Sequence, residues 1–267
     1  MNRLQKLFLK KEKAPEKLLS VFLTAGYPEL ECTAELVSAV EHAGADFIEL
    51  GMPFSDPVAD GPTIQMSSQQ ALKNGMNMHK ILAQIKQIRK QSNIPMLMMG
   101  YFNPFMHYGF ERLVDHAEEA GIDGFIIPDI LPEDFQRFSG TFEYHSIGLN
   151  YLISPNTTPE RIKKVADLTH DFIYCVSVTG VTGARTGVAA STISFLQSLK
   201  ALLSKPYLVG FGISNPDDAA TLARHCDGII VGSAVIKILA QEIGFNKKLE
   251  AVGDFITGLK RGLKGVK

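Results

Sequence analysis

Eight short apolar segments recur along the chain, separated by segments with helical spacing of apolar residues. The apolar segments are residues 18–25, 46–53, 95–102, 124–130, 147–154, 172–179, 207–213 and 228–235. Nearly continuous apolar runs of this length are typical of strands that are covered on both faces of a parallel sheet. Eight strand–helix units within 267 residues predict the α/β class, as a (β/α)₈ TIM barrel that forms a single domain over residues 1–267.

Two helices beyond the regular eight are expected. The spacing of Leu4, Leu7 and Phe8 predicts a short amphipathic helix at the N-terminus. The span from Asp60 to Pro95 is longer than one connection needs, so it predicts an extra helix between strands two and three. A doubly wound sheet is the structural alternative, but it would need a GxGxxG turn after the first strand, where the chain reads TAGYPELE.

Local signals also predict where helices begin and end. Gly44 and Gly121 are expected to end helices in the left-handed conformation. Asn215 before Pro216 reads as a helix cap with a proline in the first turn, and Ser233 could cap the helix that follows the last strand.

Composition argues against several classes of protein. The net charge is −1 and no basic run stands out, which argues against a dedicated nucleic-acid or anionic-membrane binder. Cys32, Cys175 and Cys226 are scattered and odd in number, as in a reducing compartment. The N-terminus has no apolar signal region and no apolar run reaches the length of a membrane span. We therefore expect a soluble, cytoplasmic protein.

In a barrel of this kind, functional residues lie at the C-terminal ends of the strands and in the loops that follow. The last two strands end in residues 210–218 and 231–237, where glycines lead directly into helices. One glycine-rich turn would be ordinary turn chemistry, but two at these places favour a phosphate site. Residues 177–191 combine glycines and threonines with Arg185, which suits a lid over an anionic ligand as well as a plain surface loop.

The strand ends narrow the choice of chemistry. None of the eight strand segments contains a lysine for a Schiff base, and no HxH or HExxH pattern indicates a metal, so no metal site is expected. The polar groups that remain near strand ends are Glu49, Asp56, Asp60, Tyr101, Asn103, Asp129 and Tyr174. This set favours proton transfer without a metal ion.

Glu49 and Asp60 are the strongest candidates for that chemistry. Glu49 lies in an apolar strand, and burial would raise its pKa into the range of a group that both gives and takes a proton. A barrel glutamate paired with a polar neighbour is the alternative. For Asp60, which precedes Gly61, a turn residue is the more usual explanation on sequence alone.

Several motifs resemble one known family over essentially the whole chain. The segment ELGMPFSDPVADG at residues 49–61 is similar to the signature of the tryptophan synthase α subunit. TAGYP at 24–28, SVTGVTGAR at 177–185, GFGI at 210–213 and GSA at 232–234 match further family segments in the same order. The resemblance implies a TIM barrel that cleaves indole-3-glycerol phosphate to indole and glyceraldehyde 3-phosphate.

The resemblance also implies roles for individual residues. Glu49 would be the acid/base at indole C3 and the glycerol hydroxyl, and Asp60 would accept the indole N–H. The phosphate would bind backbone N–H groups of Gly183, Gly212, Gly232 and Ser233. The pocket around the indole ring would be formed by Phe22, Met99, Tyr101, Ile127, Ile153, Tyr174, Thr182 and Phe211, although most apolar residues in a barrel are simply core.

Family resemblance further implies a partner, the β subunit, in an α₂β₂ complex. The β subunit carries the pyridoxal phosphate, so this chain would have no cofactor, and Asp56, Pro57 and Asn103 would lie near the interface. Two other readings stay open. One is a different phosphosugar enzyme on the same barrel, for which we would expect a catalytic lysine, cysteine or second carboxylate at other strand ends. The other is a non-catalytic module that binds a phosphate ligand and activates a partner.

Overall fold

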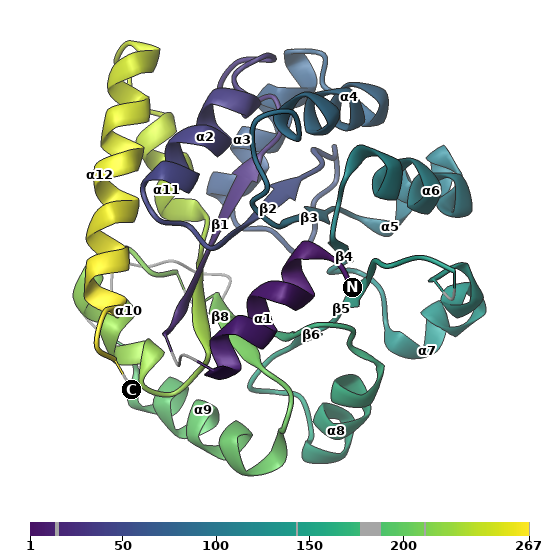
Figure 1. The fold of residues 1–267 in the computed structure, drawn as a ribbon, viewed down its shortest axis with the longest axis vertical. Helices are drawn as coiled ribbons and strands as arrows, with labels where there is room; N and C mark the ends of the chain where they lie inside the picture. Colours follow the sequence, from purple (N-terminus) through teal and green to yellow (C-terminus); the bar gives the residue numbers. More distant parts are fainter. Residues whose placement is uncertain (14–15, 143, 177–187, 211, 267) are drawn as a thin grey trace.

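Parallel strands form a barrel with helices around it in the computed structural model, which describes residues 1–13, 16–142, 144–176, 188–210 and 212–266 (Figure 1). The strands are β1 (Leu18–Thr24), β2 (Phe47–Gly51), β3 (Met96–Met99), β4 (Gly124–Ile126), β5 (Gly148–Asn150), β6 (Leu152–Ile153), β7 (Ile173–Val176), β8 (Tyr207–Gly210) and β9 (Gly228–Val231). Their hydrogen-bonded order is β5-β4-β3-β2-β1-β9-β8-β7-β6. Only Tyr151 separates β5 from β6, so these two strands are halves of one strand position. They stand at the two ends of the strand order, and the sheet therefore curls into a nearly closed barrel. The predicted (β/α)₈ fold is confirmed, with its fifth strand split.

The helices include both predicted additions. They are α1 (Arg3–Lys13), α2 (Thr33–His42), α3 (Pro62–Lys73), α4 (Met78–Ile88), α5 (Phe102–Tyr108), α6 (Phe110–Ala120), α7 (Pro132–Phe135), α8 (Pro159–Leu168), α9 (Ala190–Leu202), α10 (Pro216–Ala223), α11 (Ser233–Leu239) and α12 (Phe245–Leu263), with a 3₁₀ helix η1 (Gln136–Phe142). The N-terminal α1 and the extra α3 are as expected, whereas α5 is a further helix that the sequence analysis did not predict. A proline in the first turn of α5 is tolerated because its missing N–H would have no partner there.

Helix ends follow the sequence signals with one exception. Gly44 and Gly121 have φ of +105° and +97°, the left-handed conformation expected where a helix stops. The side chain of Asn215 accepts a hydrogen bond from the N–H of Asp218 at 2.9 Å, as a cap should. The predicted Ser233 cap is wrong, because α11 already begins at Ser233 and the capping position falls on Gly232.

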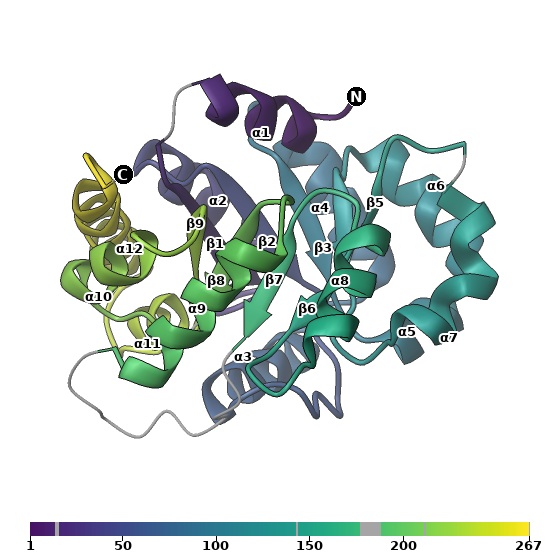
Figure 2. The ribbon, with the colours of Figure 1, turned by 90° about the horizontal axis from the view of Figure 1, so that it is seen from below.

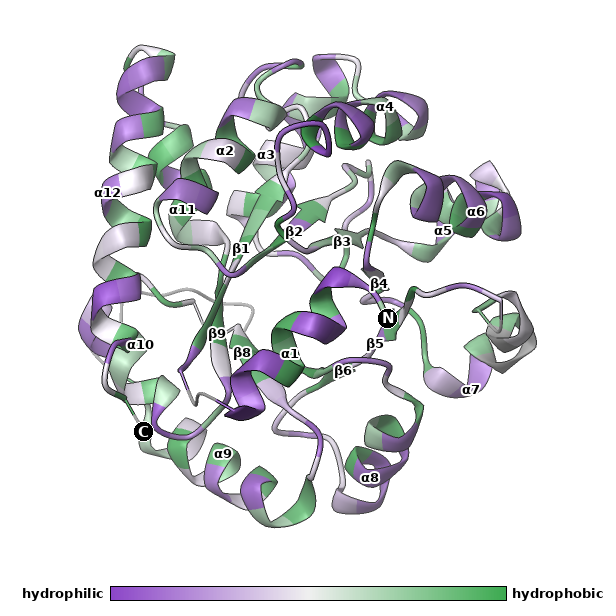
Figure 3. Ribbon diagram, in the orientation of Figure 1, coloured by the Kyte–Doolittle hydropathy of each residue, from purple (hydrophilic) through white to green (hydrophobic). Residues whose placement is uncertain are grey.

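Side chains alternate between the inside of the barrel and the layer under the helices, because successive residues of a strand point to opposite faces. Leu18, Phe47 and Leu97 belong to the cluster inside the barrel, while Leu19 and Ile48 belong to the larger cluster under the helices. Figure 3 shows hydrophobic strands surrounded by helices of mixed hydropathy. Glu49 follows Phe47 by two residues and therefore points into the barrel. Within the described ranges, no helix is both long enough and apolar enough to cross a membrane.

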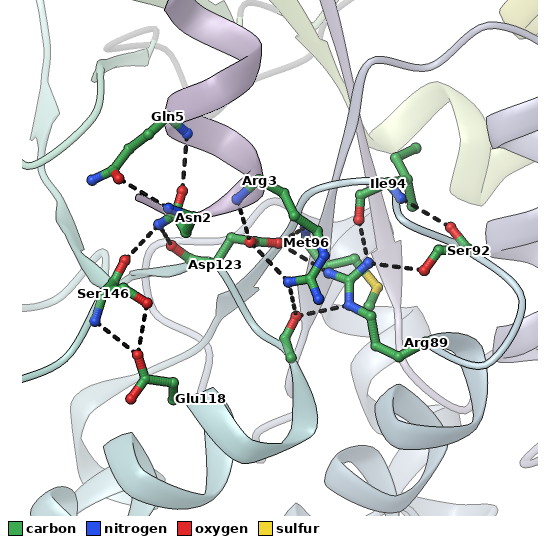
Figure 4. Close-up of polar contacts among 11 residues, drawn as sticks. Asn2, Arg3, Gln5, Arg89, Ser92, Ile94, Met96, Glu118, Asp123 and Ser146 are labelled. Atoms are coloured by element: carbon green, nitrogen blue, oxygen red, sulfur yellow. Dashed lines mark hydrogen bonds and ion pairs between the residues drawn. The ribbon is translucent and has the colours of Figure 1, made fainter.

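Helix α1 lies across the N-terminal ends of the strands (Figures 1 and 2). It is tied there by Asp123, a fully buried residue that directly precedes β4. The carboxylate accepts hydrogen bonds from the Arg3 N–H and Nη1, both at 3.1 Å, from Arg89 Nη2 at 3.0 Å, and from the Met96 N–H at 2.9 Å (Figure 4). This network closes one end of the barrel and leaves the opposite end for chemistry.

Candidate active site

A cavity of about 470 Å³ opens at the C-terminal ends of the strands. Such a volume is within the range of small-molecule sites. Several of the residues predicted from the sequence line this cavity, and they are Phe22, Asp60, Met99, Ile153, Tyr174, Gly212, Gly232 and Ser233. Two other predicted pocket residues do not line it: Ile127 packs in the cluster under the helices, and Tyr101 is buried behind the wall. Thr182, Gly183 and Phe211 lie outside the described residues.

Glu49 is fully buried and does not itself line the cavity. Its Oε1 accepts a hydrogen bond from Ser20 Oγ at 2.7 Å, whereas Oε2 is buried with no hydrogen-bond partner among the described residues. Burial raises the pKa of Glu49 to about 8, and the hydroxyls of Ser20 and Tyr174 oppose that rise. Tyr174 lines the cavity, so the carboxyl lies directly behind the cavity wall. The pKa is that of a group able to give and take a proton near neutral pH.

Asp60 is held on the cavity wall by Tyr101. The Tyr101 hydroxyl donates to Asp60 Oδ2 at 2.9 Å and accepts the Ala59 N–H at 2.9 Å, so one tyrosine ties the side chain and its own loop together. Partial burial raises the pKa of Asp60, and the hydrogen bond from Tyr101 opposes the rise. The ring of Tyr101 packs against Phe54 with 5.4 Å between ring centroids, which fixes the tyrosine in turn. Asp60 therefore lines the cavity with its carboxylate held by Tyr101.

Glycine residues form the cavity wall at the ends of β8 and β9. Gly212 has a φ of +63°, a backbone conformation that side chains disfavour. A Cβ on Gly232 would lie 3.1 Å from Cβ of Phe22, so glycine allows the backbone to lie close to Phe22, which also lines the cavity. Gly212, Gly232 and Ser233 are close enough together to line one cavity, which is the arrangement expected of a phosphate-binding wall.

The predicted interface residues lie near the mouth but outside the cavity lining. Asp56 and Asn103 are exposed, and Pro57 is buried. Val58 lies between Pro57 and the catalytic candidate Asp60, and its side chain is 82% exposed.

Apart from Ile153, sequence reasoning missed one side of the cavity, formed by β6, α8 and the loop after β4. Tyr151, Ser154, Thr157 and Arg161 line it. Arg161 is paired there with Glu133, with Nη1 to Oε1 at 3.2 Å and Nη2 to Oε2 at 3.0 Å. The sequence did contain a signal, because Ser154 is a polar residue at the end of a predicted strand. Ser20 was also missed, since only the C-terminal ends of strands were searched for polar groups.

The fold and the cavity together define the class of protein. A barrel of parallel strands holds one buried carboxyl of raised pKa behind the cavity and a second carboxylate on its wall, opposite a glycine-lined end. In the part of the chain that the structure describes, no group of three or more His, Cys, Asp or Glu side chains is placed to hold a metal ion. These features are those of an acid–base enzyme on the (β/α)₈ barrel.

Comparison with known proteins makes the assignment specific. Residues 8–262 match the model of the family "Tryptophan synthase alpha chain". The tryptophan synthase alpha chain of Geotalea uraniireducens is 44% identical over 266 residues, covering 100% of this chain and 99% of that protein. This chain belongs to the tryptophan synthase alpha chain family.

Solved structures agree with this membership. The crystal structure of a tryptophan synthase alpha chain from Legionella pneumophila has a TM-score of 0.90 and 34% sequence identity, covering 100% of this chain and 98% of that one. A chain in the aminoacrylate-bound form of tryptophan synthase from Mycobacterium tuberculosis has a TM-score of 0.86 and 28% identity, covering 99% and 100%. The fold and the family therefore agree along the full length of the chain.

Proposed function

We propose that this chain carries out the α reaction of tryptophan biosynthesis, the cleavage of indole-3-glycerol phosphate to indole and glyceraldehyde 3-phosphate, on one barrel domain over residues 1–267. Membership of the alpha chain family supports the reaction. The single observation that carries the catalytic part is the fully buried Glu49, whose pKa is raised to about 8. A carboxyl with that pKa can serve as acid and base in turn at neutral pH.

In the proposed mechanism, the Glu49 carboxyl first donates its proton to C3 of the indole ring. The ring nitrogen gains positive charge in the resulting indolenine, and the Asp60 carboxylate accepts the hydrogen bond from its N–H. The Glu49 carboxylate then takes the proton of the adjacent glycerol hydroxyl. The bond between C3 and that carbon breaks, its electron pair returns to the ring, and the aldehyde forms. Glu49 ends the cycle protonated, as it began.

Substrate binding is assigned to the two ends of the cavity. The phosphate would accept hydrogen bonds from backbone N–H groups of Gly183, Gly212, Gly232 and Ser233. The indole ring would lie between Phe22, Met99, Ile153 and Tyr174, which line the cavity, with Thr182 and Phe211 as further candidates. Tyr101 would contribute through Asp60, which its hydroxyl holds in place.

The proposal is tested by incubating the purified chain with indole-3-glycerol phosphate, alone and with an added β subunit. We expect indole and glyceraldehyde 3-phosphate in equal amounts. The complete lack of indole, even with the β subunit present, would refute the proposed reaction and favour a non-catalytic role in binding a phosphate ligand.

Asp60→Asn should lower kcat by about 10²-fold or more, because removing a well-placed charged partner of the developing cation costs at least that much. The amide can still accept the hydrogen bond from Tyr101, so the loop should keep its shape. Steady-state kinetics of indole release check this, with Asp254→Asn, at an exposed aspartate on α12, as the matched control. An unchanged kcat in Asp60→Asn would leave this residue a purely structural role.

For the partner, we propose the β subunit of tryptophan synthase in an α₂β₂ complex in the cytoplasm. The similarity to a chain of tryptophan synthase from Mycobacterium tuberculosis supports such an assembly. The contact surface would include Asp56, Pro57 and Asn103, with the exposed Val58 beside them. Pyridoxal phosphate would belong to the β subunit, so this chain would act without a cofactor of its own.

A further inference from the structure

The inside of the barrel around Glu49 is mostly apolar, and Ser20 on β1 is one of the few buried polar residues there. Its register neighbours place it one layer below Glu49: Ser20 pairs with Phe47, and Phe22 pairs with Glu49. Both Ser20 and Glu49 are fully buried. A serine at such a position has an energetic cost unless its hydroxyl finds a partner, and the partner here is the Glu49 carboxyl. The cavity lining does not include Ser20, so it is not placed to touch a substrate.

The hydrogen bond from Ser20 makes the two oxygens of Glu49 different. Oε1 accepts from Ser20 Oγ at 2.7 Å, while Oε2 has no hydrogen-bond partner among the described residues. A protonated carboxyl carries its hydrogen on one oxygen only. Because Oε1 is already engaged as an acceptor, the hydrogen belongs on Oε2.

We propose that Ser20 is a positioning residue for Glu49: its hydroxyl holds Oε1 and leaves Oε2 as the oxygen that carries and transfers the proton. The proposal deepens the function proposed above and rests on it. Ser20 acts through Glu49, so removing its hydroxyl should disturb proton transfer and leave substrate binding nearly intact.

The other groups near Glu49 differ from Ser20 in where they lie. Tyr174 on β7 faces the carboxyl, and its hydroxyl also keeps the pKa of Glu49 from rising further, but Tyr174 lines the cavity, which Ser20 does not. Asp60 reaches this region from the loop after β2, and Tyr101 holds it on the cavity wall. On β3, the residue in register with Glu49 is Leu97, which is apolar. Ser20 is therefore the group that fixes Oε1.

The test compares Ser20→Ala and Ser20→Thr with the wild-type chain, using indole-3-glycerol phosphate and the β subunit. The hydroxyl stabilises the ionised form of Glu49, so its loss should raise the pKa of that carboxyl. In Ser20→Ala we expect kcat to fall on the order of tenfold, as for loss of a hydrogen bond to a charged group, with KM little changed. The midpoint of the kcat–pH profile should move upward by about one pH unit. Ser20→Thr, which keeps a hydroxyl, should restore both values toward those of the wild type.

Ser92→Ala is the matched control. Ser92 is another buried serine, 8% exposed, and its hydroxyl accepts the Ile94 N–H at 3.1 Å at the opposite end of the barrel. It should shift neither kcat nor the pH midpoint. If Ser20→Thr does not fold, Ser20→Cys takes its place, because the thiol is a weaker donor and should give values between those of Ala and the wild type.

The outcomes separate the two proposals. If the wild-type chain releases no indole, the proposed function fails first. If the wild type is active and Ser20→Ala keeps the wild-type pH midpoint, then Ser20 does not act through Glu49 and the present inference is wrong, whatever happens to kcat. An upward shift of the midpoint that the threonine variant reverses supports it.

Discussion

Glu49→Gln should abolish indole formation, lowering kcat by about 10²–10⁴-fold for each proton-transfer step that the carboxyl serves. Glutamine has nearly the shape of the protonated carboxyl and can still accept the hydrogen bond from Ser20, so the cavity should be preserved. Substrate binding should survive, because the residues assigned to the indole ring and the phosphate are unchanged. Single-turnover measurements of indole release, together with binding of glyceraldehyde 3-phosphate, check both halves of the expectation.

The exposed Glu35 on α2 supplies the control, and Glu35→Gln should retain full activity. Turnover in Glu49→Gln above about a tenth of the wild-type rate would contradict the acid/base role, since even one lost step costs more than that. Loss of ligand binding along with turnover would point instead to a disturbed cavity.

The pH dependence of the free energy of unfolding of Glu49→Gln tests the raised pKa of Glu49 independently of catalysis. The pKa of Glu49 rises from an ordinary 4.5 to about 8 on folding. Between these pH values the folded protein keeps a proton that the unfolded chain has lost, so the free energy of unfolding falls as pH rises, by about 1.4 kcal/mol per pH unit at most. Glutamine has no such proton. Urea unfolding near pH 5 and near pH 8 should therefore show Glu49→Gln gaining stability relative to the wild type as pH rises, and a constant difference would contradict the raised pKa.

The fold could be predicted from the sequence because the pattern repeats. Eight apolar runs alternate with helical spacing, and each run supplies a strand position of the barrel. The break at Tyr151 could not be predicted, because the segment IGLNYLIS reads as one strand, and the interruption depends on how its two halves pair with β4 and β7. Helix α5 was missed for a similar reason, since Pro104 suggests a loop until its place in the first turn is known.

The site was predictable where chemistry and strand position coincide. Glu49 stood out as a carboxylate in an apolar strand, and the glycines after the last two strands indicated an anion-binding wall. What a linear pattern could not supply was pairing between distant segments, such as the bonds from Ser20 to Glu49 and from Tyr101 to Asp60. Ile127 lies under the helices because successive residues of a strand point to opposite faces. A shift of one residue in the predicted alternation is enough to place it on the wrong face.

Asp123→Ala should have the largest effect on stability, although it lies at the end of the barrel away from the cavity. Its carboxylate is fully buried and accepts hydrogen bonds from Arg3, Arg89 and the Met96 N–H (Figure 4). Burial already lowers the pKa of Arg89 to about 10, with Asp123 opposing that effect. Removing the carboxylate leaves the guanidinium group buried without its partner, a change that costs about 3–5 kcal/mol.

Urea unfolding measures that loss. Asp254→Ala, which removes an exposed aspartate on α12, is the control. Arg3→Ala should cost less than Asp123→Ala, because Arg3 is partly exposed and its removal leaves the pair of Arg89 with Asp123 intact. A loss below about 1 kcal/mol in Asp123→Ala would mean that the buried carboxylate contributes little to holding α1 against β4. Because functional residues of such barrels lie at the other end, kcat per folded molecule should stay near the wild-type value well below the unfolding temperature. The two ends of the barrel would then have different roles: Asp123 at one end stabilises the fold, and Glu49 toward the other end serves catalysis.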